Sequence, residues 1–148
     1  MSDTRTYPQR PFLAVSAAIV RDGKLLVVRR ARKPAQNLYT FPGGGVEIGE
    51  TMTEAAAREV REETQLSIEV VGYAGHREAI ARDAQGAVAR HFVVVCFAAR
   101  WLAGEPTLNE ELDDARWVMP ADLAGLRTTD GLAEIATAAM TLIAGGNR

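Results

Sequence analysis

The sequence predicts an α/β (α+β) fold in which a mixed β-sheet carries helices on its faces. Apolar, β-branched segments lie on both sides of one central segment of strong helix formers, and an amphipathic segment closes the chain. The chain has 148 residues, of which 47% are hydrophobic, as in one compact domain with a core of useful size. We therefore expect a polar N-terminal tail over residues 1–11 and a single domain over residues 12–148.

The first elements are expected to form a β-hairpin. Residues 12–20 and 24–28 are apolar and β-branched, and Asp22 and Gly23 between them form a strong signal for a tight turn. Three short pieces should then lead to the central helix: a loop over residues 31–37, a strand over residues 38–42 and a flexible glycine corner over residues 43–45.

The central helix has a clear start. Thr51 and Glu54 have the spacing of a capping box, and residues 53–64 (TEAAAREVREET) are rich in good helix formers. The second half of the chain is expected to contain, in order, a long strand over residues 67–80, a turn over 83–86, a strand over 90–101, a polar loop over 102–114, a strand over 115–119, a helical turn over 120–126 and a last helix over about 130–144.

Composition narrows the classes of function. The chain carries 17 Lys and Arg against 19 Asp and Glu, so it lacks the basic excess typical of proteins that bind duplex nucleic acid. The longest apolar stretch, residues 92–99, is too short to cross a bilayer. The first residues lack the apolar segment of a signal peptide, so we expect a cytoplasmic protein without a membrane partner. Cys96 is the single cysteine and is expected to be a buried thiol.

The central helix presents an unusual acidic face. Glu59, Glu62 and Glu63 are spaced i, i+3 and i+4, which places three carboxylates on one side of a helix. Such like charges repel one another, and a divalent cation relieves the repulsion. Mg²⁺ prefers oxygen ligands and keeps sites open for water and phosphate. The glutamate spacing therefore predicts a divalent-metal site.

The glycine corner adds a second part to this site. Residues 43–45 carry no Cβ atoms, so the backbone can approach a ligand closely and turn a carbonyl toward a metal. Glu47 and Glu50 add carboxylates nearby. A metal in an acidic pocket of this kind polarises phosphoryl oxygens and acidifies water, which suits hydrolysis of a phosphoric anhydride.

This stretch resembles the Nudix box, the signature of Nudix (MutT-like) hydrolases. The box reads Gly, five residues, Glu, seven residues, then Arg-Glu-apolar-any-Glu-Glu-any-Gly-apolar. The matching residues are Gly44, Glu50, Arg58, Glu59, Val60, Glu62, Glu63 and Leu66, and residues 39–44 (YTFPGG) resemble the usual lead-in.

The resemblance implies a Nudix-type α/β/α sandwich that hydrolyses a nucleoside diphosphate linked to a moiety X by water attack on phosphorus. It assigns Mg²⁺ or Mn²⁺ to Glu59, Glu62, Glu63 and the Gly43 carbonyl. Arg58 would hold a glutamate in place through charge-assisted hydrogen bonds. The general base would be Glu59 or a glutamate from a later loop, for which the candidates are Glu110 and Glu111, and we place Glu111 with Glu59 and Arg58 as catalytic residues.

One position departs from the box. Gln65 stands where the family usually has glycine, at the expected left-handed end of the helix. A residue other than glycine costs roughly 1 kcal/mol in that conformation. We therefore expect the departure to affect local stability more than chemistry.

Other candidate residues each allow two interpretations, one functional and one structural. Arg29 and Arg30 either clamp phosphate or form a solvated pair at a strand end, and Tyr39 either stacks on a base or packs on the sheet. We take these three as substrate-binding candidates. Three strand residues near the expected cleft, His76, Arg77 and His91, are interpreted as solvated, and Trp101 and Trp117 as packing residues.

The substrate and the class of activity leave alternatives. The nucleotide could be ADP-ribose or an (oxidised) nucleoside triphosphate, and a homodimer is compatible with the resemblance. A catalytically inactive Nudix-fold binding or regulatory module is the main alternative, although such a module has no need of a repulsive glutamate triad. A Nudix-fold isomerase acting on an isoprenoid diphosphate would call for a cysteine near the site, and Cys96 lies outside the box.

Overall fold

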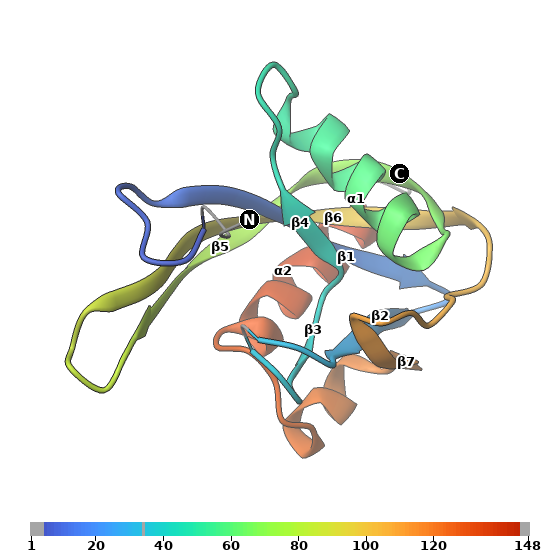
Figure 1. Cartoon of the computed structure of the whole chain (residues 1–148). Coiled ribbons are helices and arrows are strands. Elements are labelled where there is room, and N and C mark those ends of the chain that lie inside the picture. Colours follow the sequence, from blue (N-terminus) through green and yellow to red (C-terminus); the bar gives the residue numbers. More distant parts are fainter. Residues whose placement is uncertain (1–4, 34, 146–148) are drawn as a thin grey trace.

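The computed structural model describes residues 5–33 and 35–145 and contains one seven-stranded mixed sheet with two α-helices. The elements in chain order are β1 (Phe12–Arg21), β2 (Lys24–Arg30), β3 (Tyr39–Thr40), β4 (Gly43–Gly45), α1 (Met52–Thr64), β5 (Ser67–Arg82), β6 (Val88–Ala103), β7 (Leu112–Val118), the 3₁₀ helix η1 (Pro120–Gly125) and α2 (Leu132–Gly145) (Figure 1).

Strand pairing makes the sheet mixed, as predicted. The main path runs β3-β2-β1-β6-β5, with β4 paired to β1 and β7 paired to β2. Strands β1 and β6 are parallel over the register from Phe12–Phe92 to Val20–Arg100, whereas the other pairs are antiparallel. The β1–β2 hairpin is confirmed, because Asp22 and Gly23 take the positive φ values of 50° and 78° that a tight hairpin turn of this kind requires.

Alternating side chains of β1 and β2 build a core on each face of the sheet. Ala18 and Leu25 pack in the cluster that contains the apolar face of α2, while Ala17 and Leu26 pack in the cluster that contains Val60 of α1. The two helices therefore cover opposite faces, and the predicted α/β/α sandwich is confirmed (Figure 1).

Several predicted boundaries were wrong. Residues 43–45 form β4 on β1 instead of a flexible corner, because the glycines allow the two backbones to meet. Strand β7 starts at Leu112, inside the predicted loop, since Leu112 is buried and pairs with Arg30. The last helix starts at Leu132 instead of 130, and β5 and β6 form a longer hairpin than predicted.

The described part of the N-terminal tail packs on this long hairpin. Tyr7 donates its N–H to the Ala89 carbonyl at 2.8 Å and its hydroxyl to an Asp83 carboxylate oxygen at 2.8 Å. Within the described residues, no helix has the length and apolar character needed to cross a membrane.

Helix α1 begins and ends as the sequence predicts. The Thr51 side chain accepts from the Glu54 N–H, and the Glu54 carboxylate accepts from the Thr51 N–H, which completes the capping box. At the other end Gln65 is left-handed, with φ 69° and ψ 16°, and its N–H donates to the Arg61 carbonyl.

We expect Gln65→Gly to stabilise the protein by roughly 0.5–1 kcal/mol, since glycine carries no Cβ penalty in this conformation. Activity should not change, because Gln65 is exposed at the far end of the helix from β4. The measurement is the free energy of unfolding in urea. The matched control is Gln85→Gly, at an exposed glutamine without a positive φ, which should be neutral or destabilising. Destabilisation by Gln65→Gly would contradict the cap interpretation.

Candidate active site

The site forms where β4 and α1 meet. Strand β4 lies antiparallel to β1, with Gly44 opposite Val15 and Gly43 opposite Ser16. A Cβ atom added to Gly44 would lie 2.3 Å from Oε2 of Glu59, and one added to Gly43 would lie 2.0 Å from the Val15 carbonyl oxygen. The two glycines thus have different tasks: Gly43 allows the strand pairing, and Gly44 leaves room for a carboxylate of α1.

The glycines provide a test of the Glu59 position. Gly44→Ala should reduce kcat by about tenfold or more, because a shift of about one ångström in a reacting group costs up to about 10²-fold. The melting temperature should change little, since the Cβ atom meets the flexible end of a side chain. Gly45→Ala is the matched control, because a Cβ atom there meets nothing within 4 Å. Equal activities of the two variants would refute this role for Gly44.

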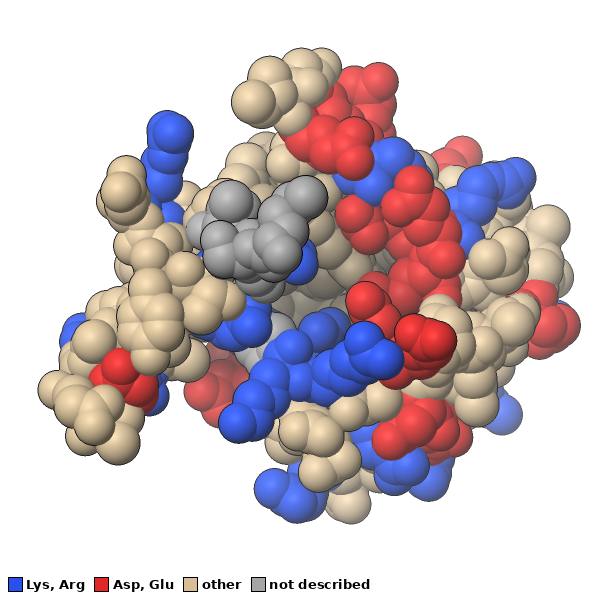
Figure 2. Space-filling view, in the orientation of Figure 1, with Lys and Arg blue, Asp and Glu red and all other residues tan. Residues whose placement is uncertain are grey.

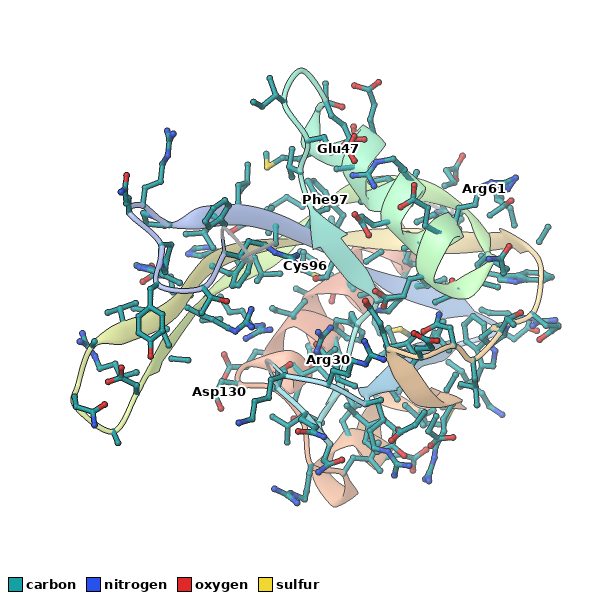
Figure 3. All side chains as sticks on the ribbon, in the orientation of Figure 1. Arg30, Glu47, Arg61, Cys96, Phe97 and Asp130 are labelled. Carbon is teal, nitrogen blue, oxygen red and sulfur yellow. The ribbon has the colours of Figure 1, made fainter. Side chains whose placement is uncertain are left out.

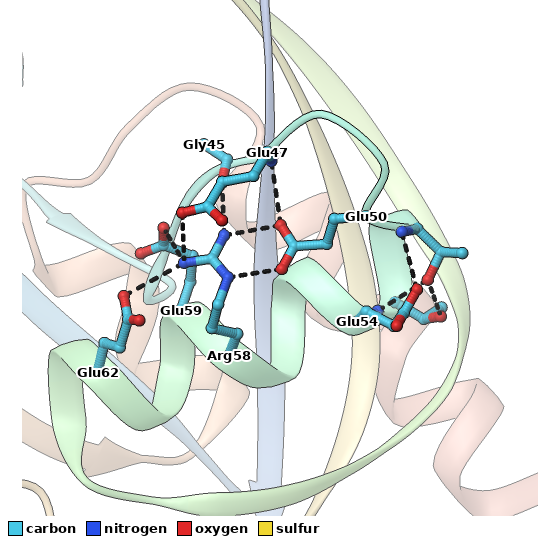
Figure 4. A network of polar contacts seen from close by, with 9 residues as sticks. Gly45, Glu47, Glu50, Glu54, Arg58, Glu59 and Glu62 are labelled. Carbon is cyan, nitrogen blue, oxygen red and sulfur yellow. Dashed lines mark hydrogen bonds and ion pairs between the residues drawn. The ribbon is translucent and has the colours of Figure 1, made fainter.

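Arg58 holds the carboxylates of the site together (Figure 4). Its Nε and Nη2 donate to the two oxygens of Glu50 at 2.6 and 2.8 Å, and Nη2 also donates to the Gly45 carbonyl at 3.0 Å. Its Nη1 donates to Oε1 of Glu59 at 2.9 Å and to Oε2 of Glu62 at 3.2 Å. The hydrogen bonds from Arg58 lower the pKa of Glu50 to about 2, so this carboxylate stays ionised.

Glu59 and Glu63 face the interior of the site. Burial raises the pKa of both carboxyl groups, and that of Glu63 reaches about 7. Around Glu63, the charges of Glu59 and Glu111 also raise its pKa, whereas Arg30 and the N–H of Gly43 lower it. These partners show that Glu63 lies where α1, β4, the end of β2 and the loop before β7 converge.

The loop before β7 is tied to α1 by one asparagine. Asn109 donates its side-chain N–H to the Glu63 carbonyl at 2.8 Å, and its Oδ1 accepts the N–H of Glu111 at 2.8 Å. This bridge fixes the backbone of Glu111 relative to Glu63. Of the two base candidates, Glu111 lines the cleft described below, whereas Glu110 is exposed and paired with Arg32 at 3.4 Å.

The donor set of α1 fits a divalent cation. Carboxylate oxygens are the ligands that Mg²⁺ and Mn²⁺ prefer, and burial with mutual repulsion makes two of these carboxylates costly without a cation. In residues 5–33 and 35–145, no three Asp, Glu, His or Cys side chains stand close enough to hold an ion as they are. Glu59 and Glu62 each give one oxygen to Arg58, so a metal would be held by their other oxygens and by Glu63 after these side chains rotate.

A cleft of about 450 Å³ opens next to these carboxylates, over the glycines of β4. Its floor includes Ala14 and Ser16 of β1 and Phe92 and Val94 of β6. Figure 2 shows basic and acidic residues gathered in two adjoining bands around a hollow. The basic residues that line the cleft are Arg5, Arg30, Arg32, Lys33, Arg77 and Arg90, and the acidic ones are Glu78, Glu111 and Asp130.

The structure separates the three predicted substrate residues. Arg30 lines the cleft, as expected of a phosphate ligand. Arg29 points elsewhere and pairs with Asp113 at 2.6 Å. Tyr39 is only 5% exposed, packs in the core and donates its hydroxyl to an Asp114 carboxylate. The packing alternative for Tyr39 is therefore the one that the structure shows, and neither Tyr39 nor Arg29 is among the residues of the cleft.

Two residues of the site were missed. Arg77, interpreted as solvated, lines the cleft and is partly buried, and burial lowers its pKa. Its spacing in the strand alone could not show which face it occupies, because β5 is bulged between Tyr73 and Gly75. Asn109 was predicted to be part of a polar loop. Asparagine side chains in turns often hydrogen-bond to nearby backbone groups, which is the signal that could have identified it.

The predictions for His76, Cys96, Trp101 and Trp117 hold, whereas His91, predicted to be solvated, is half-buried on β6. His76 is exposed, and its Nδ1 is hydrogen-bonded to the Tyr73 hydroxyl at 2.8 Å. Cys96 is 1% exposed, and burial raises its pKa to about 11, so its thiol is not a nucleophile. Trp101 and Trp117 pack beside the α1 core, with the Arg21 guanidinium 3.8 Å from the centre of the Trp101 ring.

Comparison with known proteins identifies relatives of this chain in sequence and in fold. The chain is 33% identical over 107 residues to an ADP-ribose pyrophosphatase of Methanocaldococcus jannaschii, covering 72% of this chain and 61% of the relative. It is 35% identical over 107 residues to an NAD-capped RNA hydrolase NudC of Haemophilus influenzae, covering 70% of this chain and 38% of the relative. The chain thus spans less than two thirds of these relatives.

Solved structures agree with the sequence relatives. A MutT NUDIX hydrolase from Burkholderia pseudomallei has a TM-score of 0.74 at 27% identity, over 91% of this chain and 99% of that one. Models of protein families match residues 10–138 to the NUDIX domain, which covers the whole sheet, α1 and the first half of α2. The chain therefore belongs to the NUDIX domain family.

Proposed function

We propose that this protein is a metal-dependent pyrophosphohydrolase that cleaves a nucleoside diphosphate linked to a moiety X, with Mg²⁺ or Mn²⁺ as cofactor. The observation that carries the proposal is the juxtaposition of the α1 carboxylates with a cationic cleft. Glu63 is influenced electrostatically by Glu59, Glu111 and Arg30, and the last two line that cleft.

Each part of the site has a task in this reaction. Glu59, Glu62, Glu63 and the Gly43 carbonyl would hold the cation, which polarises phosphoryl oxygens and acidifies water when bound. Arg58 orients Glu59 and keeps Glu50 ionised. Arg30 places positive charge beside the substrate phosphates.

The proton of the attacking water needs an acceptor. We assign this role to Glu111, with Glu59 as the alternative. Glu111 lines the cleft. The side-chain oxygen of Asn109 accepts the Glu111 N–H at 2.8 Å, which fixes the backbone of Glu111. Glu59 already gives one oxygen to Arg58, and this hydrogen bond opposes the rise in pKa that burial causes. Water attack on phosphorus then releases a nucleotide and phosphoryl-X.

The relatives support a nucleotide substrate. The archaeal relative is described as an ADP-ribose pyrophosphatase and the bacterial one as an NAD-capped RNA hydrolase, and both substrates contain a nucleoside diphosphate. ADP-ribose and nucleoside triphosphates, oxidised ones included, are therefore the first small-molecule candidates. A cytoplasmic location and a homodimer stay predictions, and light scattering of the purified protein would test the dimer.

The proposed function predicts that hydrolysis requires a divalent metal. A panel of nucleoside triphosphates, oxidised nucleotides, ADP-ribose, other nucleotide sugars and dinucleoside polyphosphates should give turnover with Mg²⁺ or Mn²⁺ and none in excess EDTA. Product analysis should find a nucleotide and phosphoryl-X. Full activity in EDTA on any of these substrates would contradict a metal-dependent mechanism.

A binding or regulatory module without catalysis is the second candidate. It predicts nucleotide binding with no turnover on the whole panel. The retained carboxylates and the shifted pKa values of Glu59 and Glu63 favour the enzyme, because a pure binder gains nothing from them. An isoprenoid isomerase that uses a cysteine is disfavoured, because Cys96 is buried.

A further inference from the structure

One basic residue of the cleft differs from the others in its surroundings. Arg77 on β5 lines the cleft and is partly buried. Across the described ranges, no hydrogen bond or close ion pair is formed by its guanidinium group, and the groups that act on it electrostatically include Asp130, Arg30 and Cys96. A partly buried cation without hydrogen-bond acceptors is costly, and a ligand that supplies acceptors removes the cost.

The strand register places Arg77 on the floor of the cleft. Arg77 is directly opposite Val94 on β6, and Val94 is directly opposite Ala14 on β1. Residues that are opposite in register share one face of the sheet, and all three line the cleft. The arginine therefore lies in line with Val94 and Ala14, whose side chains offer it no acceptor.

Arg30 is the basic residue that links the α1 carboxylates with Arg77. Its charge acts on both Glu63 and Arg77, and Arg30 and Arg77 both line the cleft. Arg30 and Asp130 are labelled in Figure 3, and both line the cleft. Arg30, Arg77 and Asp130 thus belong to the same cleft, which opens next to the α1 carboxylates.

We propose that Arg77 is a specificity-determining residue, which binds a phosphate group that the substrate carries beyond the pyrophosphate held at α1. This inference rests on the proposed function. Six basic residues and three acidic ones line the described cleft. The Arg77 guanidinium forms no hydrogen bond within the described residues, so it suits a nucleotide that carries a further phosphate to supply the acceptors. The planar guanidinium donates two parallel hydrogen bonds to phosphate oxygens.

Nucleotide binding in EDTA tests the proposal without turnover. We would measure the dissociation constants of AMP, ADP and ATP by calorimetry for the wild type and for Arg77→Gln. ATP affinity should fall at least about tenfold, as for loss of a charge-assisted hydrogen bond. ADP and AMP carry no phosphate beyond a pyrophosphate, so their affinities should stay unchanged. The matched control is Arg82→Gln, on the same strand but outside the cleft, which should bind all three as the wild type does.

A variant at Asp130 should act in the opposite direction. This carboxylate lies in the cleft, so Asp130→Asn removes a repulsion and should tighten ATP binding several-fold. Arg77→Lys keeps the charge but loses the planar fork, and it should show an intermediate loss; it also serves if Arg77→Gln fails to fold.

The outcomes separate this proposal from the proposed function. Unchanged ATP binding in Arg77→Gln, or an equal loss for AMP, ADP and ATP, would overturn it, since the second result means contact with the base or sugar. Unchanged or weaker ATP binding in Asp130→Asn would count against it as well. These assays use no metal, so they can fail while the α1 experiments succeed, and the reverse.

Discussion

Replacing Glu63 with glutamine should reduce kcat by at least about 10²-fold at saturating Mg²⁺, as expected when one metal ligand is lost. Glutamine keeps the shape of the side chain, so packing with Gly43 and Asn109 should persist. It lacks the negative charge, so the cation is held less tightly. Glu62→Gln should also lower kcat. The matched control is Glu134→Gln on the exposed side of α2, which should leave kcat unchanged.

Stability should move in the opposite direction from activity. Burial raises the pKa of Glu63 to about 7, so in the metal-free protein its neutral form is favoured by folding. That contribution is present at low pH and is lost as the pH rises through 7. In EDTA, Glu63→Gln should therefore melt at a higher temperature than the wild type above pH 7, and at a similar temperature near about pH 5. Wild-type kcat in both glutamine variants would show that these carboxylates are not the metal site.

Arg58→Ala should lower kcat by about 10–100-fold, the usual range for loss of a group that orients a metal ligand. The guanidinium group donates to Glu50, Glu59 and Glu62 at once, so its removal leaves three carboxylates without their shared cation. We expect a large fall in kcat and a smaller effect on the melting temperature. Part of the repulsion between the three carboxylates is relieved when their side chains rotate into solvent.

The control for Arg58 is Arg61→Ala, one turn along the same helix. Arg61 is exposed, and among the described residues its side chain hydrogen-bonds only to the Ser67 hydroxyl, at 3.4 Å, so this variant should keep wild-type kcat. Mn²⁺ affinity is a second measurement. Arg58→Ala should weaken it, because Glu59 is then misoriented. Normal kcat and normal Mn²⁺ affinity with a lowered melting temperature would assign Arg58 a purely structural role.

The parts of the fold that the sequence predicted are those determined by local chemistry. Asp22 and Gly23 predict the hairpin because few residue pairs tolerate two positive φ values. Thr51 and Glu54 predict the start of α1 through hydrogen bonds within one turn, and the box position of Gln65 predicts its left-handed cap. Each of these features depends on residues close in the chain.

The parts that were missed depend on contacts between distant segments. Strand β4 exists because Gly43 can meet the Val15 carbonyl of β1, which no pattern around residue 43 reveals. The position of Arg77 in the cleft depends on bulges in the pairing of β5 with β6. Tyr39 is held in the core by Asp114, a partner 75 residues away.

The central claim is that the carboxylates of α1 bind the metal that hydrolysis requires. Mn²⁺ binding followed by electron paramagnetic resonance, with kcat measured at the same Mn²⁺ concentrations, tests it most directly. For the wild type, we expect kcat to rise with the occupancy of the bound metal. For Glu63→Gln, both curves should shift to higher Mn²⁺ together, while Glu134→Gln should follow the wild type. Mn²⁺ binding of wild-type strength in Glu63→Gln, or turnover that does not follow occupancy, would contradict the claim.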